Sequence, residues 1–531
     1  MTASASVLAP KEINVGLIGV GVVGSSVLDF FANGPMELPV PGARFGDPGS
    51  VHVRLWSAAR RSRESAAGAS EETIASIVSR DSDGVPRFYH EGDGGTSGPA
   101  WREVVYDDNV DVVVELTGSA GAEAMIEEAL WNGKSVVTAN KAVLSRTGYE
   151  LVKLAQSRGS VLAYEAAVGG GMPIVQTIGS SIGGNITAIL GILNGTSNFI
   201  LSEMRASAES KSEGDAYVDA VQAAIRAGLA EADPSADVLG EDSRSKTIVL
   251  AGLGFGVRLR PRDVYFRGIA RKGTQRLGSE LNSDAIFHAT DLRVLSALGY
   301  VPKLLAGAQI VRAGSDGERV VAWSQPAAVP FNHPLAGVDG SENACLLEVE
   351  SPTGSTTKGY NIMLRGPGAG GPETASSVIA DLRFCARQVT TAAGGTRNGE
   401  GPPESSPLYM YGMGAFSRPQ SYPGTPSILA SDDLKTPFLL RFLTDEASAD
   451  IHVGKLLSES GLTVTSGPGE AASSAYHYFR TAPASLGAIE RGIEAVLKAF
   501  DGPRLPLDVL YLPVLEGAHW DERGRQGNNG L

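Results

Sequence analysis

The stretch Ile13–Gly24 reads INVGLIGVGVVG, and it is the basis of the fold that we predict for the first part of the chain. Its apolar run ends in a glycine-rich turn, and the mainly apolar segment SSVLDFFAN follows directly. This order predicts a strand, a tight turn and a helix.

The glycines of this stretch have the spacing G-x-G-x-x-G. In such a motif the first glycine permits a tight turn, the second lets the backbone approach a pyrophosphate, and the third lets the helix pack closely on the strand. The alternative is a purely structural turn, but a strand before the motif and a helix after it are the context that a dinucleotide site requires. The residues that we expect to hold the cofactor here are Gly19, Gly21, Val22, Val23 and Gly24.

Further strands and helices alternate after this stretch. Val51–Ser57 is expected to be a strand, and Val110–Leu116 has the near-continuous apolar character of a buried parallel strand. A helical pattern at Ala122–Trp131 and a strand at Ser135–Thr138 follow. This alternation predicts an α/β fold with a Rossmann-type doubly wound parallel sheet. Between these elements we expect a loop and an insertion, at Gly34–Ser50 and Ala66–Ala100.

The pattern changes after residue 160. Ser160–Met204 predicts short strands interleaved with glycines, and helices are expected at Ala216–Gly228 and Glu241–Gly254. Asn361–Leu382 contains a second glycine-rich turn that leads into a helix, and Thr390–Ser431 has the composition of a linker. From Thr436 to Leu512 the order is strand, helix, two strands, helix and strand, and the tail after Glu516 is expected to be disordered.

Composition excludes several classes of protein. The 531 residues include 45 Lys and Arg and 59 Asp and Glu, and the net charge of −14 argues against a nucleic-acid or anionic-membrane partner. The chain has no apolar run of membrane-spanning length and no secretory signal in Met1–Lys11. Its two cysteines, Cys345 and Cys385, form no CxxC pair. We therefore expect a cytoplasmic protein.

Two arginines follow the second predicted strand. An NAD site usually has Asp or Glu there, to bind the adenosine ribose, but this chain has Arg60 and Arg61. Because a guanidinium suits a 2′-phosphate, we predict NADP in preference to NAD. The alternative is an exposed basic loop.

The segment Ala227–Lys246, AGLAEADPSADVLGEDSRSK, concentrates acidic residues before a lysine. Asp242 and Lys246 are four residues apart and share a face of the predicted helix. Oxidation of an alcohol needs a base for the hydroxyl proton, which a lysine near apolar groups can supply. Carboxylates of Glu231, Asp237 and Asp242 could bind an ammonium group of a ligand. The alternative is an ion pair on the surface.

Lys141, in VVTANKAVLS, is a second candidate for catalysis. It closely follows a predicted strand, and ligands of open parallel sheets bind at the carboxyl ends of strands. The alternative is an exposed lysine at the start of a helix.

At this point the chain resembles the homoserine dehydrogenase family. The resemblance rests on six motifs in the family's order: GVGVVG, VVTANKAVLS, YEAAVGGGMPI, LNGTSNFILSEM, GLAEADPSADVLGEDSRSK and RGPGAGGPETASSV. They cover about residues 13 to 385. The resemblance implies reversible hydride transfer between NAD(P)H and aspartate 4-semialdehyde or L-homoserine, in threonine, methionine and isoleucine biosynthesis.

The resemblance also implies roles for individual residues. Lys246 would be the proton donor and acceptor, Asp242 would position it, and Lys141 would lie between nicotinamide and substrate. Substrate binding is implied for Glu231, Asp237, Asp242 and Thr196, and cofactor binding for Thr117, Lys141, Gly228, Gly366, Gly368 and Gly370.

Family members often bind a monovalent cation such as sodium. The ligands implied here are Glu165 and the backbone at Val168, Gly170 and Met172. Glycines that cluster bring carbonyl oxygens together, which suits a hard cation. The alternative is that these glycines serve tight packing.

The resemblance implies four regions and a tail. We expect an NAD(P)-binding domain at 1–160, completed by 335–385, and a catalytic and dimerisation domain with a mixed sheet at 161–334. A linker at 386–434 precedes an ACT-like βαββαβ domain at 435–515 and a tail at 516–531. A homodimer or homotetramer is implied.

ACT domains often bind amino acids, and many bacterial relatives are inhibited by threonine. Here Asp445–Ser448 (DEAS) replaces the usual Asp-x-Pro-Gly of the ligand-binding turn. Binding of an effector and a purely structural or dimerising role therefore both stay open.

Two other functions are compatible with a nucleotide-binding fold. One is another semialdehyde or amino-acid dehydrogenase, and the Glu231–Lys246 segment argues against it. The other is an inactive NADP-binding sensor, which the presence of both Asp242 and Lys246 disfavours.

Overall fold

The computed structural model divides into two compact units. Unit 1 comprises Met1–Gly183, Gly252–Arg258 and Gly366–Pro423, and unit 2 comprises Gly184–Ala251, Leu259–Arg365 and Gly424–Leu531. The structure describes residues 11–39, 50–61, 68–91, 99–119, 121–182, 184–208, 215–270, 285–312, 318–350, 359–393, 427–428, 435–443, 449–466, 476–499 and 508–515.

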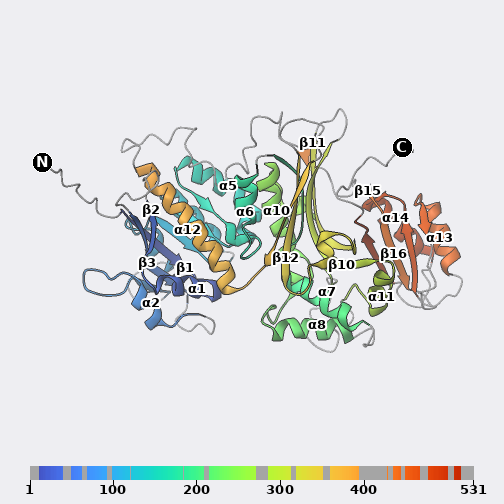
Figure 1. The fold of residues 1–531 in the computed structure, drawn as a ribbon, viewed down its shortest axis with the longest axis horizontal. Coiled ribbons are helices and arrows are strands. Elements are labelled where there is room, and N and C mark those ends of the chain that lie inside the picture. Colours follow the sequence, from blue (N-terminus) through green and yellow to red (C-terminus); the bar gives the residue numbers. More distant parts are fainter. Residues whose placement is uncertain are drawn as a thin grey trace. The chain divides into compact units, whose positions relative to one another are not determined.

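Unit 1 is built on a parallel sheet (Figure 1). Its parallel strands pair in the order β4-β3-β1-β5-β6-β7, which is the order of a dinucleotide-binding sheet. The order reverses between β1 and β5, and ligands of such sheets bind at this point. The strands are β1 (Lys11–Ile18), β3 (Ser50–Arg60), β4 (Phe88–His90), β5 (Val112–Glu115), β6 (Ser135–Thr138) and β7 (Leu162–Ala163). The predicted Rossmann-type sheet is confirmed.

Helices α1 and α12 bury apolar side chains in one core with the strands. Val27 and Leu28 of α1 and Val378 and Leu382 of α12 are fully buried together with residues of β1 and β3. In Figure 1 the orange α12 lies beside the blue elements of this unit, although it comes far later in the sequence. The helices of unit 1 are α1 (Val22–Phe31), α2 (Glu71–Ile77), α3 (Trp101–Val105), α4 (Ala122–Trp131), α5 (Lys141–Ser157), α6 (Ile174–Gln176) and α12 (Gly371–Ala393).

Two predictions for unit 1 were incomplete. The expected loop at Gly34–Ser50 contains β2 (Met36–Pro39), which pairs antiparallel with β3. The expected insertion at Ala66–Ala100 contains α2 and β4, so it supplies a strand of the sheet. Both strands are too short to produce a recognisable alternation in the sequence.

Unit 2 contains the predicted mixed sheet, with the order β13-β12-β8-β10-β11-β14 and β9 beside β11. Neighbours β12/β8, β8/β10 and β10/β11 are antiparallel, whereas β9 and β14 run parallel to β11. The strands are β8 (Asn185–Ile192), β9 (Tyr265–Phe266), β10 (Tyr300–Arg312), β11 (Glu318–Pro330), β12 (Glu342–Glu350), β13 (Tyr360–Pro367) and β14 (Ser427–Ile428).

The helices around this sheet carry the acidic segment. They are α7 (Gly195–Ser207), α8 (Asp215–Arg226), α9 (Ser235–Val238), α10 (Glu241–Phe255) and α11 (Ala289–Ala297). Of the short strands predicted within Ser160–Met204, β7 and β8 are confirmed, but the prediction was wrong for α6 and α7, which are helical. A short apolar run such as FIL does not separate strand from helix, and here a capping Asn194 begins a helix.

The C-terminal part of unit 2 has the predicted order βαββαβ. Its sheet has the order β17-β18-β16-β20, and α13 and α14 contribute buried side chains to one core with it. The elements are β16 (Phe438–Leu443), α13 (Ala449–Glu459), β17 (Val464–Ser466), β18 (Tyr476–Thr481), α14 (Leu486–Ala499) and β20 (Asp508–Pro513). The Asp445–Ser448 turn, the tail, the N-terminal residues 1–10 and most of the predicted linker lie outside the described residues.

Among the described residues, no helix has both the length and the apolar character needed to cross a membrane.

Candidate active site

The glycine-rich turn of unit 1 is sterically restricted at two positions. Gly19 has φ +97°, its N–H donates to the carbonyl of Ala59 at 3.0 Å, and a Cβ there would lie 2.7 Å from the carbonyl carbon of Leu116. A Cβ on Gly24 would lie 2.2 Å from the oxygen of Gly19. Gly21 caps α1, and a Cβ there would meet no atom within 4 Å among the described residues. The turn therefore leaves the backbone at Gly21 open to a ligand.

The N-terminus of a second helix lies beside this turn. A Cβ on Gly371, the first residue of α12, would lie 2.9 Å from Ser26 Oγ and 3.0 Å from Val22 Cγ1. Of the predicted cofactor residues, Gly366 lies at the end of β13, and Gly368 and Gly370 lie in the turn before α12, where Gly370 has φ +129°. Two helix N-termini that lie together, each with unsatisfied N–H groups, form a favourable site for a pyrophosphate.

A buried carboxylate organises the ends of β5 and β6. Glu115 is fully buried and accepts hydrogen bonds from Thr117 N at 2.7 Å, Thr117 Oγ1 at 2.6 Å and Thr138 Oγ1 at 2.7 Å. Asn140 caps α5 through Val143 N and donates to Ser119 O at 3.1 Å, so Lys141 begins that helix at a fixed position. Glu115 was not among the predicted site residues, although a charged residue that ends the apolar run VVVE was a usable signal.

Arg60 and Arg61 have different surroundings. The Arg60 side chain is buried and donates to Ala69 O at 3.2 Å and to Glu71 Oε1 at 3.2 Å. Arg61 is exposed. The structure thus places Arg60 in an ion pair with the first turn of α2 and leaves Arg61 at the surface.

Lys246 and Asp242 form a buried ion pair in unit 2. Their side chains are 9% and 6% exposed, and Lys246 Nζ lies 2.9 Å from Asp242 Oδ2. Lys246 Nζ also donates to the carbonyl oxygen of Leu193 at 2.6 Å. The alternative of a surface ion pair is therefore excluded.

Asn194 connects this pair to another predicted site residue. Its Nδ2 donates to Asp237 Oδ1 at 2.6 Å and to Asp242 Oδ2 at 2.9 Å. Thr196, on the first turn of the same helix, donates to Leu229 O at 2.8 Å, one residue after Gly228, which has φ +70°. Asp237, Asp242 and Lys246 are thus brought together, whereas Glu231 lies on an exposed loop. Asn194 was not among the predicted site residues.

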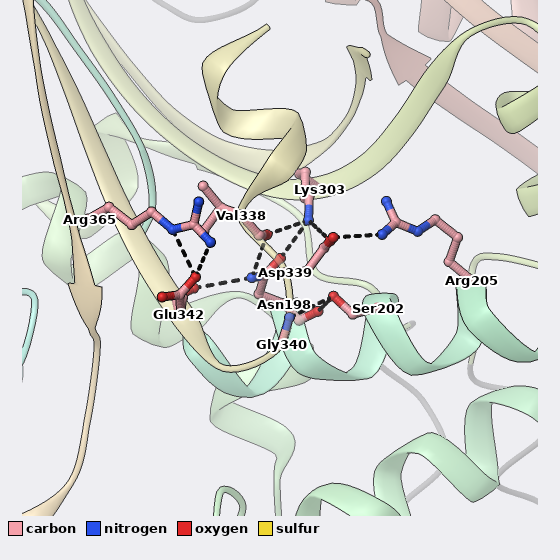
Figure 2. Close-up of polar contacts among 9 residues, drawn as sticks. All are labelled: Asn198, Ser202, Arg205, Lys303, Val338, Asp339, Gly340, Glu342 and Arg365. Carbon is pink, nitrogen blue, oxygen red and sulfur yellow. Dashed lines mark hydrogen bonds and ion pairs between the residues drawn. The ribbon is translucent and has the colours of Figure 1, made fainter. Parts of the chain in front are cut away.

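A buried lysine holds the helix that carries Asn194 (Figure 2). Lys303 of β10 is 1% exposed and donates to Asn198 Oδ1 at 3.1 Å, Val338 O at 2.5 Å and Asp339 Oδ1 at 3.0 Å. Asn198 Nδ2 in turn donates to Val338 O and to the carbonyl of Glu342. Burial lowers the pKa of Lys303, although Asp339 opposes this shift. Nothing local in the sequence around Lys303 indicated this position.

The predicted cation ligands lie in unit 1. The oxygens of the buried Glu165 carboxylate accept hydrogen bonds from Val175 N at 2.8 Å and Gln176 N at 2.7 Å, and Gly170 O accepts one from Ser377 Oγ at 2.6 Å. Within the part of the chain that the structure describes, no three His, Cys, Asp or Glu side chains form a group that could hold a metal ion.

Comparisons with known proteins agree with this geometry. Residues 19–165 match the model of the homoserine dehydrogenase NAD-binding domain, and residues 173–382 match that of homoserine dehydrogenase. A homoserine dehydrogenase of Synechocystis sp. is 36% identical over 68% of this chain and 74% of its own length. One from Pseudomonas aeruginosa is 31% identical over 86% of this chain and 88% of its own length.

A solved structure extends the likeness to almost the whole chain. The crystal structure of a homoserine dehydrogenase from Thiobacillus denitrificans has a TM-score of 0.70 and 26% identity, and the match covers 96% of this chain and 99% of that one. Together with the two family models and the curated relatives, it confirms the resemblance seen in the sequence. The chain belongs to the homoserine dehydrogenase family of NAD(P)-dependent oxidoreductases.

Proposed function

We propose that Lys246 moves the proton in the reaction of this family, the reversible hydride transfer between a nicotinamide cofactor and the pair L-homoserine and aspartate 4-semialdehyde. The buried pair of Lys246 and Asp242 carries this proposal. When bound, the nicotinamide supplies the hydride acceptor or donor. In oxidation the neutral Lys246 amine takes the proton from the hydroxyl oxygen, the carbon that bears this oxygen loses hydride to the nicotinamide, and the carbonyl bond forms. In reduction the Lys246 ammonium returns a proton to the oxygen.

The acidic groups near Lys246 suit an amino-acid substrate. The carboxylates of Asp237 and Asp242 both accept hydrogen bonds from Asn194 Nδ2, so they lie close together. A carboxylate pair of this kind stabilises an ammonium group. We propose that these two residues, together with the exposed Glu231, bind the substrate's amino group. Thr196, two residues after Asn194 on the first turn of α7, completes the proposed substrate site.

Substitution of Lys246 tests this assignment. Lys246→Ala should lower kcat by roughly 100-fold or more, because general acid–base groups contribute this much, while binding of the cofactor persists. Lys455→Ala is a matched control, since Lys455 also forms an i,i+4 ion pair, with Glu459 at 3.7 Å, but is 71% exposed. The measurement is the absorbance of reduced nicotinamide with homoserine, beside fluorescence titration of the cofactor. Loss of cofactor binding together with activity would instead assign Lys246 a structural role.

The cofactor is a nicotinamide dinucleotide, and we propose that it is NADP. The support is the absence of an acidic residue at the end of β3, where Arg60 and Arg61 stand. Arg61 is exposed and is the group we assign to the 2′-phosphate, whereas Arg60 holds α2 in place. The turns at Gly19–Gly24 and Gly366–Gly370 would hold the pyrophosphate, and Thr117, Lys141 and Gly228 would line the remainder of the cofactor.

We also propose a monovalent cation, such as sodium, at Glu165, Val168, Gly170 and Met172. A carboxylate and backbone carbonyls are hard oxygen ligands of the kind that a monovalent cation prefers, and the Glu165 carboxylate is buried and held in position by Val175 N and Gln176 N. Activity in tetramethylammonium salts, compared with sodium or potassium salts, tests this site. Equal activity would remove the cation from the proposal.

The C-terminal βαββαβ part has the element order of an ACT domain, and we propose that it has a regulatory or dimerising role. We further propose that the protein is cytoplasmic, forms a homodimer or homotetramer, and has the domain boundaries given above. Equilibrium sedimentation, and activity with and without threonine, test the assembly and the effector.

A further inference from the structure

We propose that Asn194 is a positioning residue that sets the geometry of the Lys246–Asp242 pair. This proposal rests on the proton-transfer role assigned above to Lys246. The sequence analysis assigned a role to Thr196 in the motif LNGTSNFILSEM but none to Asn194.

The side chain of Asn194 uses both ends of its amide. Nδ2 donates to Asp237 Oδ1 at 2.6 Å and to Asp242 Oδ2 at 2.9 Å, and Oδ1 accepts from Ser197 N at 2.7 Å. These partners determine the orientation of the amide, because carboxylates accept and a backbone N–H donates. The residue is 4% exposed. One neutral group therefore bridges carboxylates from α9 and α10.

The adjacent residues Leu193 and Asn194 contact both Lys246 and Asp242. The carbonyl of Leu193 accepts from Lys246 Nζ at 2.6 Å, and the amide of Asn194 donates to Asp242. Asp242 Oδ2 is shared, since it lies 2.9 Å from both Lys246 Nζ and Asn194 Nδ2. A rotation of Asn194 would thus change the position of the carboxylate that orients the lysine.

The first turns of α7 hold Asn194 in place. Asn198, one turn further along, accepts from the buried Lys303 and donates to Val338 O and Glu342 O (Figure 2). Ser202, a turn later, accepts from Gly340 N at 3.1 Å. These contacts tie the helix to residues 338–342, so the cap residue at its start has a fixed backbone.

Only some residue types could replace this function. Serine and aspartate cap a helix about as well as asparagine, because each accepts from the N–H groups of the first turn. Neither can donate to two carboxylates. Without the bridging amide, the negative charges of Asp237 and Asp242 would face each other, and like charges disfavour the doubly ionised state.

The variant Asn194→Ser tests the proposal. It keeps the cap but replaces the two amide N–H donors with a single hydroxyl, which cannot bridge both carboxylates. We therefore expect kcat for homoserine oxidation to fall about 10- to 100-fold, the range for a displaced catalytic group. On the acid side of the pH–rate profile, activity should be lost at a higher pH than in the wild-type enzyme. Cofactor affinity and the thermal midpoint should stay close to wild type.

A second variant and a control keep the test decisive. Asn194→Asp has the same size and retains the cap, and it should lose more activity because a third carboxylate joins the cluster. Ser485→Ala removes the Ala488 N to Ser485 cap bond of α14 and should leave kcat unchanged. Wild-type kcat and pH profile in both Asn194 variants would overturn the proposal. If Lys246→Ala were fully active, the proposed role of Lys246 would fail instead, which separates the two failures.

Discussion

Arg60 and Arg61 are adjacent, yet their environments differ in a way that their sequence does not reveal. The Arg60 guanidinium lies 5.3 Å from the Phe88 ring centre and pairs with Glu71, while Arg61 is exposed. A buried, paired arginine has little capacity left for a ligand, and its loss leaves an uncompensated partner. At the scale of single residues, burial separates a structural cation from one that can bind a phosphate.

Cofactor preference should therefore respond to Arg61. Arg61→Glu should weaken NADP by about tenfold or more and leave NAD nearly unchanged, because a carboxylate repels the 2′-phosphate. Fluorescence titration with each reduced cofactor measures the two dissociation constants. Arg80→Glu, on the turn before β4, serves as a control for general charge effects. An equal loss of affinity for both cofactors would contradict the assignment of Arg61 to the 2′-phosphate.

At the scale of elements, α7 combines a chemical and a structural task. Its cap residue contacts two carboxylates, and its second and third turns are held by residues of β10 and of the segment 338–342. Asp339 completes this attachment by pairing with both Lys303 and Arg205, at 3.0 and 2.9 Å (Figure 2). The position of Asn194 therefore depends on charges more than one turn away.

The ion pairs of Asp339 make the stability of the fold around α7 depend on pH. Burial raises the pKa of Asp339, but Lys303 and Arg205 outweigh it and hold the pKa below its ordinary value of 3.8. A lowered carboxyl pKa stabilises the fold above 3.8, and this contribution is lost as the pH falls through the folded value. Asp339→Asn should lower the free energy of unfolding at pH 7 by up to about 1 kcal/mol, because the Asp339 carboxylate is itself half-exposed and the buried Lys303 keeps its bonds to Asn198 and Val338.

Urea unfolding at pH 7 and at pH 3 measures this effect. The difference between Asp339→Asn and wild type should shrink at pH 3, because this pH lies below 3.8 and protonation of the carboxyl in the unfolded chain already removes part of the contribution. Glu459→Gln, which removes an exposed pair, is the control. An equal difference at both pH values would show that charge plays no part.

Elements that depend on consecutive residues could be predicted from the sequence, whereas elements that depend on contacts between distant segments could not. The strand, turn and helix from β1 to α1 follow from consecutive residues, and the i,i+4 spacing of Asp242 and Lys246 places both on one face. By contrast, β4 is a strand only because β3 offers it an edge, and Lys303 is buried only because Asn198 and Val338 supply acceptors. Such contacts join segments that are far apart in sequence.

At the scale of the whole molecule, the C-terminal βαββαβ part is joined to the rest of unit 2 by a buried ion pair. Arg441 of β16 is fully buried, with Nε 3.4 Å from Asp291 Oδ1, and Tyr478 Oη donates to the same oxygen at 2.8 Å. Apolar residues surround this contact, and Leu439 and Leu512 share one core with Leu201 of α7. A change in the C-terminal part would therefore reach the helix that begins at the active-site cap.

Removal of Arg441 should have a large effect on stability. Arg441→Met leaves the Asp291 carboxylate buried without its cation, which typically costs about 3–5 kcal/mol. Arg441→Met combined with Asp291→Asn should be less destabilised than the single variant, because no charge remains buried. Denaturant unfolding of the two single variants and the double variant forms the cycle. Additive losses would contradict a direct coupling of these two residues.

The position of α12 also bears on how the protein is made. Its buried face completes the core of unit 1, yet it follows α1 by 340 residues (371 minus 31). Ribosomes add about 5–20 residues per second. The interval between the synthesis of α1 and that of its partner helix α12 is therefore roughly 20–70 seconds. During that interval the nascent chain exposes the apolar surface that α12 buries in the finished protein.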